Sequence, residues 1–97
     1  MIKHIVSFKL RGEAAERRKA AEDFRDALLA LPAVIPQLRS MEVGLQENPA
    51  ETWDVVLTAV VDTMEDVALY ANHPAHVAAA SIIAHLKEAR ACVDYSF

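Results

Sequence analysis

The 97-residue chain has very little of what several familiar kinds of site require. Its one cysteine, Cys92, has no second thiol for a disulfide within the chain, which favours a reducing compartment. Its two glycines, Gly12 and Gly44, lie in separate regions, so no glycine-rich loop for a phosphate group can be assembled. No segment approaches the ~20 apolar residues of a membrane-spanning helix. We therefore expect no disulfide scaffold, no nucleotide-cradling loop and no membrane span.

Positive charge is scarce as well. Ten Lys and Arg residues stand against 14 Asp and Glu residues, for a formal net charge of −4. Attachment to nucleic acid or anionic lipid depends on clustered Lys and Arg, so we expect neither partner. The one basic run, Arg17-Arg18-Lys19, is surrounded by glutamates and an aspartate, which is typical of a solvated helix face. The first residues are interrupted by charge and lack the apolar core of a signal peptide, so we expect a cytoplasmic protein.

The composition, with 54% hydrophobic and 25% charged residues, is that of one globular domain spanning residues 1–97. A chain of this length buries only about 60–65% of its unfolded surface. Its stability is therefore marginal, and association with a second subunit would add to it.

Four segments have the pattern of β-strands. Ile2–Leu10 alternates with a period of two, and Ala91–Phe97 alternates at the end of the chain. Trp53–Asp62 is rich in β-branched residues and apolar on both faces, so we expect it inside the sheet. Leu38–Gln46 carries charged residues and suits an edge.

Three segments have the pattern of helices. Glu13–Leu31 has apolar residues at helical spacing, and Pro32 prevents its continuation. Thr63 is a suitable N-cap for a short helix at Met64–Ala71. Proline favours the first turn of a helix, so we expect another at Pro74–Lys87.

This order of elements predicts an α+β protein with the ferredoxin-like β-α-β-β-α-β arrangement, in which the helices cover one face of a four-stranded antiparallel sheet. The other face is left uncovered, although it includes apolar side chains such as Ile5, Val56 and Val60. A second copy that lays its own sheet against this face would remove them from water, so we expect a homodimer.

The groups suited to proton transfer lie mainly in one stretch, Tyr70 to Val77, which holds a phenol and two imidazoles. A third imidazole, His4, interrupts the apolar face of the first strand, where an unpaired ring would be costly. His76 is either a general base or a half-buried polar residue with a backbone partner. His4 either bonds to Tyr70 or His76, or is satisfied by backbone or water. His73 precedes a proline and is better suited to shaping or capping the helix start than to chemistry.

Several segments together resemble the stress-responsive α/β-barrel (Dabb) domain family of the dimeric α/β-barrel superfamily. The resemblance spans essentially the whole chain. Its most specific part is a His-Pro-x-His element combined with a histidine in the first strand. The segments that carry it are Lys3-His4-Ile5-Val6, Ile35-Pro36, Met41-Glu42-Val43-Gly44, Trp53-Asp54-Val55-Val56-Leu57, Tyr70 ahead of His73-Pro74-Ala75-His76, and Val93-Asp94-Tyr95.

The resemblance implies a homodimer whose two sheets form a shared barrel, with no cofactor and no metal. Most members have no assigned reaction. A plant polyketide cyclase of the family carries out a cofactor-free aldol condensation, and its catalytic His and Tyr have the motif context of His76 and Tyr70. Its strand-one histidine matches His4.

Two functions follow as expectations. The first is a homodimeric module that binds a small apolar, carbonyl-containing molecule. The alternative is a cofactor-free cyclase or lyase with His76 as base and with Tyr70 and His4 orienting or donating. The residues that we expect to contact the ligand are Val6, Phe8, Phe24, Leu28 and His73. Cys92 has no evident activating partner, so nucleophilic catalysis has little support.

Overall fold

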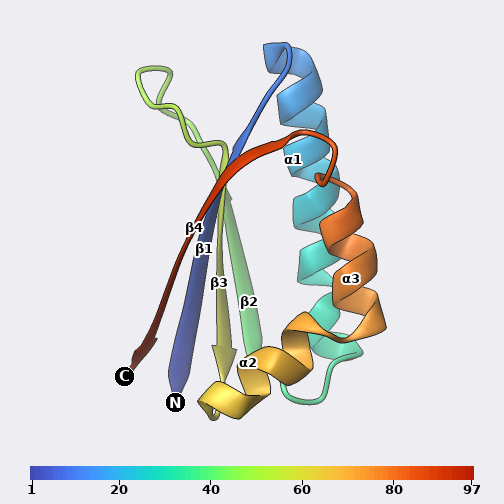
Figure 1. The fold of residues 1–97 in the computed structure, drawn as a ribbon, viewed down its shortest axis with the longest axis vertical. Helices are drawn as coiled ribbons and strands as arrows, with labels where there is room; N and C mark the ends of the chain where they lie inside the picture. Colours follow the sequence, from blue (N-terminus) through green and yellow to red (C-terminus); the bar gives the residue numbers. More distant parts are fainter.

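The computed structural model describes residues 1–97 and confirms the ferredoxin-like fold (Figure 1). Its four strands form one antiparallel sheet in the order β2-β3-β1-β4. The elements are β1 (Ile2–Leu10), α1 (Ala14–Leu29), a 3₁₀ turn (Leu31–Ala33), β2 (Ser40–Leu45), β3 (Val55–Val61), α2 (Met64–Ala71), α3 (Pro74–Ser81) and β4 (Lys87–Ser96). The interior position of β3 and the edge position of β2 are as predicted.

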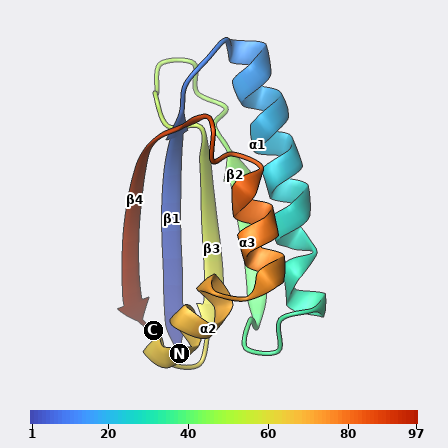
Figure 2. The same ribbon diagram turned by 45° about the vertical axis from the view of Figure 1, so that its right-hand side comes forward.

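The core lies between the sheet and the helices, which are all on one side of it (Figure 2). β1 alternates strictly and buries every second side chain against the helices. α1 contributes Ala21, Phe24 and Leu28 to the same core, at helical spacing. The ring of Phe24 meets Phe8 of β1 edge to face at 5.5 Å between centroids. These contacts join α1 to β1, while most of the helix packs over β2 at the edge of the sheet.

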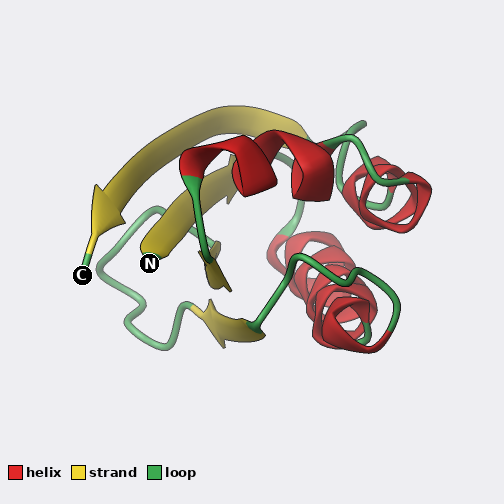
Figure 3. Ribbon diagram, turned by 90° about the horizontal axis from the view of Figure 1, so that it is seen from below, coloured by secondary structure: helices red, strands yellow, loops and turns green.

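α2 covers the lower end of the molecule, and α3 packs beside α1 (Figure 1). Seen from below, α2 crosses that end, while α1 and α3 lie together to one side of the strands (Figure 3). The Thr63 side chain accepts a hydrogen bond from the Asp66 amide at 3.3 Å and so caps α2, as predicted. None of the helices has both the length and the apolar character needed to cross a bilayer.

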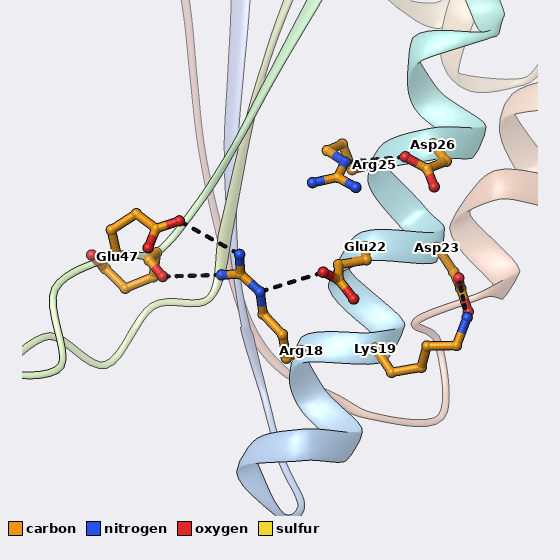
Figure 4. Close-up of polar contacts among 8 residues, drawn as sticks. Arg18, Lys19, Glu22, Asp23, Arg25, Asp26 and Glu47 are labelled. Atoms are coloured by element: carbon orange, nitrogen blue, oxygen red, sulfur yellow. Dashed lines mark hydrogen bonds and ion pairs between the residues drawn. The ribbon is translucent and has the colours of Figure 1, made fainter.

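The basic run of α1 lies on its solvated side, as the sequence indicated. Lys19 pairs with Asp23 at 2.8 Å one turn along the helix (Figure 4). Arg18 lies between Glu22 of α1 and Glu47 of the β2–β3 connection, at 3.7 and 3.5 Å. Exposed pairs of this kind contribute little stability. Because each of these cations is paired with a carboxylate, they form no basic patch.

The end of the last helix differs from the prediction. α3 ends at Ser81 instead of Lys87, and β4 begins at Lys87 instead of Ala91. Between them the chain makes tight turns that direct the buried side chains of Ile83 and Leu86 into the core. The Leu86 carbonyl also accepts a hydrogen bond from the Arg11 amide at 2.8 Å, which holds the turn against the end of β1. Core burial therefore overrides the helical propensity of this segment, and β4 is ten residues long.

The N-cap of α2 is testable because this helix carries Tyr70. Thr63→Ala removes the side-chain oxygen that satisfies the Asp66 amide, so the free energy of unfolding should fall by about 1 kcal/mol. Thr63→Ser keeps that oxygen and should lose only a fraction of this amount. Urea unfolding of the three proteins measures both values, and equal losses in the two variants would contradict the assigned cap.

Candidate functional site

Two helices meet at an elbow that brings Tyr70 and His76 together. Tyr70 lies in the last turn of α2 and is fully buried, with 0% of its surface exposed. His76 lies in the first turn of α3 and is half-buried. Their ring centroids are 4.5 Å apart. The proximity expected for these two residues is thus present.

The elbow follows from the local sequence. The residue before a proline is disfavoured in the helical region, and His73 is extended, with φ −64° and ψ 136°. Its Nδ1 accepts a hydrogen bond from the Ala75 amide at 3.1 Å, so the imidazole caps α3. The interpretation of His73 as a capping residue is confirmed, and its predicted contact with a ligand stays a prediction.

The His76 imidazole is oriented by the last turn of α2. Its Nδ1 lies 2.8 Å from the Ala71 carbonyl oxygen, and a carbonyl can only accept, so Nδ1 carries the hydrogen. In the neutral ring, Nε2 is then the free acceptor. Burial lowers the pKa of His76 below its ordinary value, the Ala71 bond opposes this effect, and the neighbouring His4 and Arg90 side chains lower the pKa further. His76 is therefore a neutral base at pH 7.

His4 approaches the same place from the sheet. It lies in the buried row of β1 with 7% of its surface exposed, and its ring meets Tyr70 edge to face at 5.8 Å. Its Nδ1 bonds to Asp94 Oδ1 at 2.5 Å. The predicted bond to Tyr70, His76 or a backbone group is therefore absent at Nδ1, where Asp94 is the partner. Asp94 lies directly across the β1–β4 ladder from His4, a pairing that only the strand register reveals.

The Tyr70 hydroxyl is the one buried side-chain polar atom without a hydrogen-bond partner. Burial raises the pKa of Tyr70 above its ordinary value of 10.0, so the hydroxyl keeps its proton at neutral pH. It is therefore a hydrogen-bond donor with no acceptor. Buried polar groups are normally satisfied, and an unsatisfied one costs roughly 1–3 kcal/mol.

Cys92 joins this cluster from β4, where it is half-buried instead of sealed in the core. Its Sγ lies 3.6 Å from His4 Nδ1 and 3.8 Å from Asp94 Oδ1. Burial and the Asp94 charge raise the pKa of the Cys92 thiol, which keeps it protonated and disfavours a nucleophilic role. These three side chains are also the donor set that a metal ion would use, since their ligand atoms lie within 4.8 Å of one another. The direct His4–Asp94 bond already pairs two of the three donors.

The predicted apolar ligand contacts lie on the core side of this cluster. Val6, Phe24 and Leu28 are fully buried, and Phe8 packs against Phe24. Their contact with a ligand remains a prediction. A surface cavity of about 800 Å³ lies elsewhere, between the start of α1 and the β2–β3 connection around Trp53. It is lined mainly by polar and charged side chains that are paired with one another.

A family model described as "Stress responsive A/B Barrel Domain" matches residues 2–97. The chain belongs to this family. The Dabb assignment made from the sequence motifs is therefore confirmed over essentially the whole chain.

Three known proteins are similar to this chain over nearly its whole length. A dimeric protein of unknown function with a ferredoxin-like fold, from Bacteroides fragilis, is 50% identical, with a TM-score of 0.96 over 99% of this chain and 95% of its own. A dimeric ferredoxin-like protein of unknown function from Thermobifida fusca is 30% identical, with a TM-score of 0.83 over 99% of this chain and 90% of its own. Olivetolic acid cyclase of Cannabis sativa is 26% identical over 98 residues, which cover 98% of this chain and 95% of the cyclase.

The burial of His76 makes a testable prediction about pH. Its folded-state pKa lies below the ordinary 6.5, so between these two values the unfolded chain binds a proton that the folded chain does not. Stability should therefore fall as the pH drops below about 6.5. NMR titration of the ring gives the pKa directly. In His76→Gln, part of the loss of stability between pH 7 and 5 should disappear, whereas an unchanged pH profile would contradict the assignment.

Proposed function

We propose that this Dabb domain is a homodimeric module that binds a small, largely apolar molecule through a carbonyl oxygen at the α2–α3 elbow. The observation that carries the proposal is the buried Tyr70 hydroxyl, a protonated donor without an acceptor. A carbonyl oxygen would supply the missing acceptor, and Tyr70 belongs to the same apolar core as Val6 and Leu28. His76, with Nδ1 already bonded to Ala71, offers Nε2 as a second polar contact.

Dimerisation is supported by the face of the sheet opposite the helices. Val56, Val93 and Tyr95 belong to this face and are 38%, 61% and 42% exposed. Neighbouring apolar side chains of this size favour burial against another surface. The relative from Bacteroides fragilis, which is 50% identical in sequence, is a dimer with a ferredoxin-like fold, and this supports a two-fold pairing of this face.

A second function is favoured by the protonation states at the elbow. His76 is a neutral base and Tyr70 is a protonated donor, the pair needed to remove a proton next to a carbonyl while supporting the oxygen of the enolate. The His4–Asp94 pair lies against the Tyr70 ring and would orient it. The similarity to olivetolic acid cyclase is consistent with such a cofactor-free cyclase or lyase.

The dimer is tested by placing a charge on the exposed sheet face. The chain has a mass of 10.7 kDa, and the protein should behave in sedimentation as a particle of twice that mass. Val56→Asp should weaken the dimer at least tenfold, because it buries an unpaired charge in the interface. Val34→Asp is the matched control, since Val34 is also exposed but lies outside the sheet. A wild-type monomer would overturn the homodimer.

The binding and catalytic functions are separated by deuterium exchange. Acetone, cyclohexanone and acetophenone are incubated with the protein in D₂O, and exchange of the protons next to the carbonyl is followed by NMR. A binding module perturbs the Tyr70 and His76 resonances without exchange, and Tyr70→Phe weakens that binding. An enzyme also accelerates exchange, and His76→Ala lowers the rate by about 10²-fold or more. Absence of both effects for every ketone would contradict the proposed function.

A further inference from the structure

One side of β4 carries three polar or sulfur-containing side chains. Residues directly opposite in an antiparallel ladder share a face of the sheet. Asp94, Cys92 and Arg90 lie across from His4, Val6 and Phe8, which form the buried row of β1 under the helices. Arg90 therefore belongs to the helix-facing side of β4, while its own side chain is exposed. β4 itself is the edge strand of the sheet, next to β1 (Figure 2).

Arg90 is the only one of the six arginines with neither a carboxylate nor a carbonyl oxygen as a partner. The two acidic residues of β4 are already occupied, because Glu88 pairs with Lys9 at 3.8 Å and Asp94 bonds to His4 at 2.5 Å. The Arg90 guanidinium bonds only the Cys92 side chain, which leaves the rest of its fork of hydrogen-bond donors without a partner.

The positive charge of Arg90 affects the pKa values of groups at the elbow. The Arg90 guanidinium lowers the pKa of His76 and opposes the rise in the pKa of the Tyr70 and Cys92 side chains. One cation therefore acts on three groups that come from α2, α3 and β4. This agrees with the register, which puts Arg90 two residues from Cys92 on the same face.

We propose that Arg90 anchors a carboxylate of the ligand whose carbonyl oxygen binds Tyr70, so that the ligand is a small keto acid. The proposal rests on the proposed function and adds the charge of the ligand to it. A guanidinium binds a carboxylate through two parallel hydrogen bonds, which fixes orientation as well as position. One end of the ligand is then held at the sheet edge by Arg90 and the other under the elbow by Tyr70.

The test compares carboxylates with amides of the same shape. The probes are 3-acetylbenzoate, 4-acetylbenzoate and 4-oxopentanoate, each beside its primary amide, and binding is measured by NMR shifts of the Tyr70 and His76 rings. At least one carboxylate should bind ten- to hundredfold more tightly than its amide, the range for a hydrogen-bonded charge. This preference should shrink with added NaCl.

Three variants complete the test. Arg90→Gln should abolish the preference for the carboxylate, and Arg90→Lys should keep only part of it, because lysine retains the charge without the fork. Lys87→Gln is the matched control for lost charge, since it lies on the same strand and is exposed. Arg90→Gln should also raise the pKa of His76 in the absence of any ligand. An unchanged His76 pKa would overturn the position assigned to Arg90.

The outcomes distinguish the two proposals. If carboxylates and amides perturb Tyr70 and His76 equally, and Arg90→Gln has no effect on either, the binding function stands and the role of Arg90 falls. If no carboxylate and no amide binds, both fall together. A preference that survives Arg90→Gln but is lost in Lys87→Gln would move the anion to a different site and overturn the inference.

Discussion

The alternation of β1 is the constraint on which the rest of the site depends. Every second residue of this strand is buried by the helices, and His4 is the only polar member of that row. A buried imidazole without a partner would destabilise the sheet, and Asp94 supplies the partner from the adjacent strand. The His4–Asp94 bond therefore lets a polar group remain inside the core, directly beside Tyr70.

The second constraint is the elbow between α2 and α3. Pro74 requires an extended residue before it, His73 caps the new helix, and the bend turns the His76 ring toward Tyr70. The sheet and the elbow thus each bring one imidazole next to the same phenol ring. The Tyr70 hydroxyl still lacks an acceptor, and the proposed contact with a ligand oxygen rests on this observation.

Much of the fold could be predicted because its signals are local. The period of β1, the Thr63 cap and the Pro74 helix start each depend on a few neighbouring residues. The predicted end of α3 is wrong because the positions of Ile83 and Leu86 depend on burial in the core, which a local sequence pattern does not contain. The same error leaves the first residues of β4, including Arg90, outside the predicted strand. The role of Asp94 has no local signal, since its pairing with His4 spans 90 residues and depends on strand register.

The central claim is that the Tyr70 hydroxyl is kept free for an oxygen atom that the protein itself does not provide. The most direct measurement is a high-resolution crystal structure of the protein with a bound keto acid. The account predicts a ligand oxygen about 2.7–2.8 Å from Tyr70 Oη. A Tyr70 hydroxyl that donates to a protein group, with the ligand bound elsewhere, would contradict it.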